Sequence, residues 1–67
     1  MTTSNASEWI GLSKHKGQDL CETRNMIFRL LSVDGEAYFS MPDESEKRTD
    51  RVCIDIVDTR IVKAIIH

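Results

Sequence analysis

Proline, glycine and aromatic residues are all scarce in this sequence of 67 residues. It contains one Pro, three Gly, one Trp, one Tyr and two Phe. Three isolated glycines cannot form the glycine-rich loop that cradles a phosphate group, which excludes that class of nucleotide site. A chain this short forms one domain and buries only about 60% of the surface of its unfolded state. We therefore expect a small core that depends on tight packing, a disulfide or self-association.

Histidine and cysteine are equally rare, with two residues of each. His15 and His67 are not spaced with Cys21 or Cys53 as the ligands of a zinc site would be. A cysteine on a helix stripe is usually a small core residue rather than a nucleophile. We predict no metal, no cofactor and no enzymatic activity. We expect two free thiols, and the alternative is a disulfide between helix and strand that closes a loop of about 32 residues.

Neither sign of charge dominates, since nine Lys and Arg stand against eleven Asp and Glu and the net charge is −2. The basic residues are scattered, whereas phosphate binding requires clustered Lys and Arg, so we expect no nucleic-acid partner. No apolar run approaches the roughly 18–20 residues that cross a bilayer, and the first residues lack the pattern of a signal peptide. The sequence therefore predicts a cytoplasmic protein without a membrane partner, and residues 1–8 form a disordered polar tail.

The first ordered signal is the segment Trp9-Ile10-Gly11-Leu12-Ser13, in which Ser13 is a good helix N-cap. A helix is predicted from Lys14 to about Arg24, and Asn25 ends it because Asn tolerates the left-handed conformation. One stripe of this helix carries Gly17, Leu20, Cys21 and Arg24. Gly17 costs roughly 1 kcal/mol relative to Ala inside a helix, so we expect it to allow a close approach to a sheet.

Strands are predicted over residues 26–33, 36–41, 52–57 and 61–66. Asp34-Gly35 is a hairpin-type turn signal, Pro42 stops the second strand, and residues 43–50 form an exposed loop of acids and bases. The predicted fold is α+β, with one N-terminal helix packed on a small mixed β-sheet and a long exposed loop. The predicted core contains Trp9, Ile27 or Phe28, Leu30, Val52, Ile54, Ile56 and Ile65.

The order of helix, strand, loop and two further strands resembles the potato type I, or eglin-like, family of serine protease inhibitors and its short bacterial elastase-inhibitor relatives. The resemblance is carried by Trp9 to Ser13, by Phe28-Arg29-Leu30 with Asp34-Gly35, by Arg48 to Asp58, and by Ile61-Val62. It covers about residues 9–66 and implies a single domain over residues 9–67. It also implies that the 42–48 loop is presented to a serine protease in the extended shape of a substrate.

In that family, arginines of the strand after the loop hold the loop carbonyls from beneath. The resemblance assigns this support to Arg51, and Arg48 matches a basic position on the trailing side of the loop. The second supporting arginine falls on Cys53, whose thiol cannot replace a guanidinium with five donors. A loop already ordered in its bound shape avoids most of the entropy cost of binding, so a missing support weakens the expected inhibition.

The family spacing places the reactive bond near Ser45-Glu46, preceded by Glu44. The loop is about three residues longer than in the bacterial relatives, so a shifted register places Met41 or Phe39 at the tip instead. Met41 is followed by Pro42, which is rare after the scissile bond of a substrate-like loop.

A rival interpretation is a non-inhibitory intracellular binding module, of the kind that phages use against a host. Its 37–48 segment would bind a protein or a small ligand and support a homo-oligomer. Tyr38, Phe39 and Met41 are the candidate interface residues, because aromatic residues and Met are favoured in interface cores. The simpler alternative is that Tyr38 or Phe39 only fills the core.

Overall fold

The computed structural model describes residues 6–67, and residues 1–5 lie outside the described part. Its elements are η1 (Ala6–Trp9), α1 (Lys14–Thr23), β1 (Ile27–Val33), β2 (Glu36–Ala37), η2 (Glu44–Glu46), β3 (Arg51–Val57) and β4 (Arg60–Ile66). The strands form one sheet in the order β2-β1-β3-β4, in which β1 and β3 are parallel and the other neighbours antiparallel. This confirms the predicted α+β fold of one helix on a small mixed sheet.

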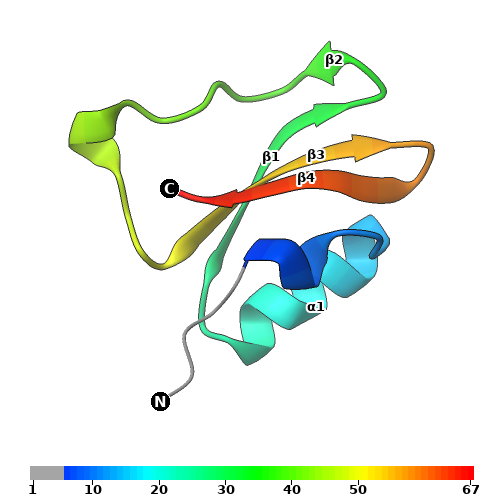
Figure 1. Cartoon of the computed structure of the whole chain (residues 1–67), viewed down its shortest axis with the longest axis horizontal. Coiled ribbons are helices and arrows are strands. Elements are labelled where there is room, and N and C mark those ends of the chain that lie inside the picture. Colours follow the sequence, from blue (N-terminus) through cyan, green and yellow to red (C-terminus); the bar gives the residue numbers. More distant parts are fainter. Residues whose placement is uncertain (1–5) are drawn as a thin grey trace.

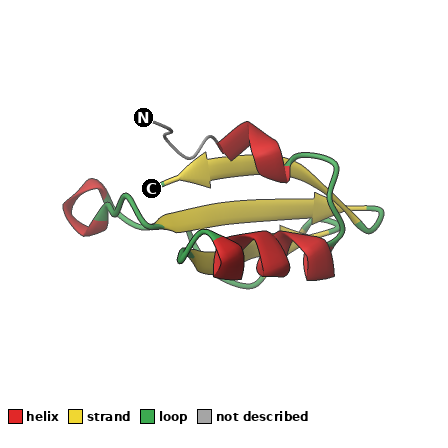
Figure 2. Cartoon of the chain, turned by 90° about the horizontal axis from the view of Figure 1, so that it is seen from below, coloured by secondary structure: helices red, strands yellow, loops and turns green. Residues whose placement is uncertain are grey.

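The two faces of this sheet are covered by different segments of the chain. Helices α1 and η1 lie on one side of the strands, and the connection from β2 to β3 extends on the other (Figure 1). Seen from the helix side, α1 runs along the strands and η2 protrudes beyond one end of the sheet (Figure 2). Within residues 6–67, none of the helices combines the length and the apolar character that crossing a bilayer requires.

Helix α1 begins and ends where the sequence predicts. The Ser13 hydroxyl accepts a hydrogen bond from the backbone N–H of Lys16 at 3.3 Å, and Asn25 adopts a φ of 61° just beyond the helix. Arg24 in turn pairs with Glu8 and ties the end of α1 to η1. We expected a disordered tail over residues 1–8; residues 6–8 instead belong to η1, and residues 1–5 lie outside the described part.

The core lies between α1 and the sheet. Its buried side chains are those of Trp9, Cys21, Val52, Ile54, Ile56 and Ile61, with Phe28 and Leu30 packed against them. The Trp9 Nε1–H donates to the Gly17 carbonyl at 3.1 Å, so the buried indole has a partner. A Cβ on Gly17 would lie 2.6 Å from Ile61 Cδ1. The predicted close approach of the helix at Gly17 is therefore confirmed.

One predicted core position needs correction, and one open alternative is resolved. Ile27 is 45% exposed, and its neighbour Phe28 takes the core position. Ile65 pairs with Cys53 in the sheet and is not part of the core cluster. The pairing of β3 with β4 shifts between Asp55 and Ile56. A one-residue shift moves side chains to the opposite face, and Ile61 is the β4 residue buried in the core.

The second strand is also shorter than predicted. β2 spans only Glu36–Ala37, because the backbone N–H groups of Tyr38 and Phe39 both donate to the Leu31 carbonyl and the chain bends away. The loop expected over 43–50 contains the 3₁₀ helix η2. The Asp43 carbonyl accepts from the Glu46 N–H at 2.8 Å, and the Glu46 carboxylate accepts from the Asp43 N–H at 3.4 Å. The first contact is a backbone turn bond of η2, and the second, from the Asp43 N–H to the Glu46 side chain, is the contact that Glu makes in a capping box.

Candidate functional site

The segment from Tyr38 to Asp50, here called the held loop, leaves the β2 edge of the sheet and passes to the side opposite to α1 (Figure 1). Two buried side chains of the sheet, Leu31 and Cys53, do not belong to the core cluster. Pro42 of the held loop is buried as well. The sheet therefore has a second, smaller set of buried side chains on the loop side, and polar side chains surrounding it reach up to the loop backbone.

Arg51 joins the trailing half of the held loop to the end of the chain. Its Nη2–H groups donate to the Glu46 carbonyl at 2.8 Å and to the His67 carbonyl at 3.0 Å, and its Nε–H also reaches the His67 carbonyl at 3.3 Å. Arg51 is the first residue of β3, which fixes the root of this side chain in the sheet. The resemblance assigned loop support to this residue, and the structure places its guanidinium on a loop carbonyl.

Arg29 makes the corresponding contact on the leading half. Its Nε–H donates to the Ser40 carbonyl at 3.0 Å, and its guanidinium lies 5.3 Å from the centre of the Phe39 ring, within the range of a cation–π contact. In the parallel pairing of β1 with β3, Arg29 is the partner of Cys53. The adjacent strand thus supplies a guanidinium beside the position where the family resemblance lacks one.

Sequence reasoning missed Arg29 as a contact of the loop, although a signal for it was present. Phe28 and Leu30 alternate with Arg29 in a strand, so Arg29 had to point away from the core. His67 was also missed as a contact. Its Nε2 lies 2.9 Å from the Pro42 carbonyl and donates to it in the tautomer protonated there, while its backbone N–H donates to the Arg51 carbonyl at 3.1 Å.

Arg48, the other predicted support, is placed differently. Its Nε and Nη2 donate to the two carboxylate oxygens of Asp50 at 2.7 and 2.9 Å, and both residues are about half exposed. Among residues 6–67, no hydrogen bond from Arg48 to a loop carbonyl is present. The hydrogen bond from Arg48 holds the pKa of Asp50 below its usual range. Arg48 therefore closes a local ion pair at the base of the held loop.

The predicted reactive residues fall into two different backbone shapes. Glu44, Ser45 and Glu46 form η2, so the bond between Ser45 and Glu46 is helical and not in the extended shape that the resemblance implied. Met41 lies before η2, outside any helix or strand, and is 37% exposed. Asp43 is extended, with φ −67° and ψ 160°. The substrate-like shape is thus wrong for residues 44–46, and the chain before η2 is non-helical.

The candidate interface residues gather at the start of the held loop. Tyr38 is 52% exposed and Phe39 is 59% exposed, so neither of them fills the core. With Met41 they place three large apolar side chains at the surface within four residues. Exposed apolar groups that lie together, unlike single ones, are typical of a surface that binds a partner.

Both cysteines are free and buried, Cys21 on α1 in the core between helix and sheet and Cys53 on β3 outside the core cluster. Burial raises the pKa of the Cys21 thiol, and a hydrogen bond with Trp9 opposes this. Burial also raises the pKa of the Cys53 thiol, against the smaller opposing effects of the Arg51 and Arg29 charges. Across residues 6–67 there is no group of three or more His, Cys, Asp or Glu side chains able to hold a metal ion.

Comparison of the chain with protein-family models, with curated proteins and with solved structures returned no match. The likeness to the potato type I inhibitors therefore rests only on the residues and the geometry described above.

Proposed function

We propose that this protein is an inhibitor-like binding protein that presents its held loop to a serine protease. The observation that carries the proposal is the attachment of three loop carbonyls to the sheet side chains and the chain end. Ser40 is held by Arg29, Glu46 by Arg51, and Pro42 by His67. A loop fixed in this way loses little further conformational entropy when a partner binds it.

The contact segment in this proposal is residues 39–43, before η2. A protease cleft takes an extended chain, as sheet-edge recognition of peptides does, and the helical η2 cannot be read in that way. Phe39 and Met41 are the exposed side chains of this segment that suit an apolar specificity pocket. Burying either one fully contributes roughly 1.5–3 kcal/mol. Pro42 after Met41 would slow cleavage of the bond between them.

The test compares Arg51, which donates to a loop carbonyl, with the nearby Arg48, which donates to Asp50. The wild-type chain is titrated against subtilisin-like, elastase-like and chymotrypsin-like enzymes, and inhibition is expected at micromolar concentrations with the chain intact by mass spectrometry. Arg51→Ala should weaken inhibition about tenfold and allow cleavage, since a charged hydrogen bond to the loop is lost. Arg48→Ala, which removes only the contact with Asp50, is the control and should stay within about twofold.

Two outcomes contradict the proposal. One is the absence of inhibition of every enzyme at chain concentrations well above the micromolar range, and the other is rapid, complete cleavage of the wild-type held loop. If Arg51→Ala and Arg48→Ala weaken inhibition equally, inhibition does not depend on the hydrogen bond from Arg51 to the loop.

A second candidate is self-association through the start of the held loop, without inhibition. It is favoured by the exposure of Tyr38, Phe39 and Met41 together with Pro42, which suits a protease substrate poorly. Two-fold dimers are the commonest closed assembly of identical chains. Sedimentation at tens of micromolar should then give at least a dimer, and Phe39→Asp should dissociate it. A monomer mass for the wild-type chain removes this candidate.

The cytoplasmic location also belongs to the proposal. The two buried cysteines are unpaired, which suits a reducing compartment better than an oxidising one. Fractionation of cells that express the untagged chain, with detection in the cytoplasmic fraction, is the measurement. Recovery from the medium or the envelope fraction contradicts it.

A further inference from the structure

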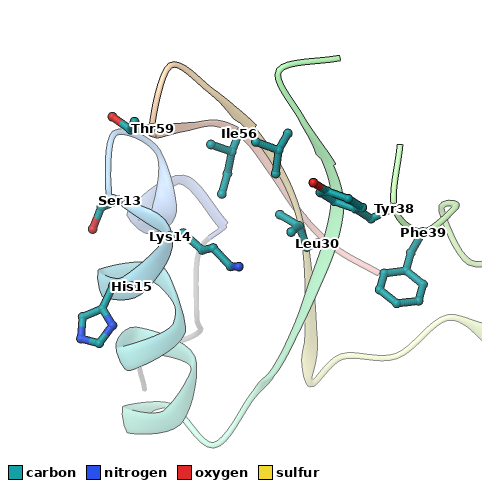
Figure 3. A pocket seen from close by; sticks show the side chains of 9 residues that line it. Ser13, Lys14, His15, Leu30, Tyr38, Phe39, Ile56 and Thr59 are labelled. Carbon is teal, nitrogen blue, oxygen red and sulfur yellow. The ribbon is translucent and has the colours of Figure 1, made fainter. Parts of the chain in front are cut away.

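An open pocket of about 740 Å³ lies between the first turn of α1 and the start of the held loop (Figure 3). Leu30 and Val33 of β1 and Ile56 of β3 form its apolar floor, and Tyr38 and Phe39 form one wall. Its volume falls within the range of small-molecule sites, which are mostly apolar and carry a few polar groups that orient the ligand.

The charged side chains that line this pocket are all basic. They are Lys14 and His15, and none of the described Asp or Glu residues lines it. His15 points away from the pocket and lies 3.5 Å from Asp19. Lys14 extends over the floor toward Leu30 (Figure 3), and no ion pair of Lys14 is found among the described residues. The pocket thus combines an apolar floor with one cation that lacks an anion.

We propose that this pocket binds a small monocarboxylate with an aromatic or alkyl body. The body would lie on Leu30, Val33 and Ile56 against the two aromatic rings, and the carboxylate would accept hydrogen bonds from Lys14 Nζ. Apolar contact contributes most of the affinity, and the ammonium selects an anion over a neutral compound of the same shape. This site is separate from the contact segment of the held loop, shares only Phe39 with it, and does not depend on the protease proposal.

The experiment is an NMR titration of the full chain, labelled with ¹⁵N, with 4-phenylbutyrate and with its uncharged amide. The carboxylate should bind with a dissociation constant of about 0.1–1 mM, as expected for a ligand of this size. Its chemical-shift changes should concentrate at Leu30, Val33, Tyr38 and Phe39. The amide should bind about threefold to fivefold more weakly, because one exposed charge pair is lost.

Two variants with the same change in charge test whether Lys14 is the source of the preference for the carboxylate over the amide. Lys14→Gln should remove the preference for the carboxylate while amide binding stays the same. Lys16→Gln, on the same helix but outside the pocket lining, should keep the preference. The wild-type comparison of the two compounds decides the question even if a variant folds poorly. Equal affinity for carboxylate and amide, shift changes away from the pocket, or equal effects of both variants overturn the proposal.

Discussion

Gly17 and Ile61 define the closest contact between α1 and the sheet. An Ala at position 17 would gain about 1 kcal/mol of helix propensity. Its Cβ would however meet Ile61 Cδ1 at 2.6 Å and Phe28 Cε1 at 3.3 Å, and overpacking a filled core costs about 1–3 kcal/mol. Gly17→Ala should therefore lower the free energy of unfolding by about 1 kcal/mol, measured by denaturant unfolding.

The control variant removes Ile61 Cδ1, the atom that a Cβ at position 17 would meet. Ile61→Val lacks Cδ1 and should cost about 0.5–1.5 kcal/mol by itself. In that background Gly17→Ala should be neutral or stabilising, because the new methyl group occupies the space that Cδ1 left. If Gly17→Ala costs the same in both backgrounds, contact with Ile61 is not the reason for the glycine.

For single residues, the sequence predicted the features that depend on residues close by in the chain. The N-cap role of Ser13, the left-handed Asn25 and the tight approach at Gly17 all follow from local geometry and helical periodicity. For Arg29, alternation with Phe28 and Leu30 indicates only that it points away from the core, whereas its place beside Cys53 depends on the register of β1 against β3. Register between strands distant in sequence is set by tertiary packing, and two register shifts in this sheet add to the difficulty.

Among the elements, the β1–β2 and β3–β4 hairpins both have turns with positive φ, but they use different residues there. Asp58 and Thr59 have φ values of 53° and 67°, and Asp34 and Gly35 have 51° and 85°. Positive φ at both central residues is the requirement of a two-residue type I′ turn. For a β-branched residue this conformation is an outlier, so the β3–β4 turn stores strain at Thr59 that the β1–β2 turn avoids with its glycine.

Thr59→Gly should consequently raise the free energy of unfolding by about 0.5–1 kcal/mol. The left-handed conformation costs roughly 1–2 kcal/mol for a residue with a Cβ, and the greater freedom of Gly in the unfolded chain offsets part of the gain. Thermal and denaturant unfolding measure it. The matched control is Gly35→Ala, whose added Cβ would meet nothing within 4 Å, so its expected loss of about 1 kcal/mol comes from the backbone alone. Changes of the same sign at both positions contradict this account.

The helix and the long strands were predicted more accurately than β2 and η2. The long strands and the helix carry sustained periodicity and were found with small errors at their ends. β2 was predicted too long because Tyr38 and Phe39 have high strand propensity, whereas the bend at the Leu31 carbonyl takes them out of the sheet. η2 was not predicted, although Asp43 followed by Glu46 three residues later is a capping-box pattern.

For the molecule as a whole, the two buried thiols link stability to alkaline pH. Burial raises the folded-state pKa of both Cys21 and Cys53 above the ordinary value of 9.0. A raised folded-state pKa contributes stability that is fully present below the unfolded-state value and is lost as pH rises through the folded-state value. The free energy of unfolding should therefore decline from about pH 9 upward, measured by urea unfolding at a series of pH values.

A variant with both cysteines changed to Ala supplies the comparison. It should be less stable at neutral pH, because two buried side chains are shortened, yet lose less stability between pH 8 and pH 11. Parallel curves for the variant and the wild-type chain would assign the alkaline decline to groups other than the two thiols.

One free thiol lies on each side of the sheet, that of Cys21 on α1 and that of Cys53 on β3, so the two thiols can report motion on the two sides separately. A thiol reagent cannot reach Cys21 until α1 separates from the sheet, nor Cys53 until the held loop rises. Their separate alkylation rates, read by mass spectrometry, therefore report the opening frequency of each layer. Cys53 labelling faster than Cys21 would identify the held loop as the layer that opens first. Equal rates that follow global unfolding would mean that helix, sheet and loop open as one cooperative unit.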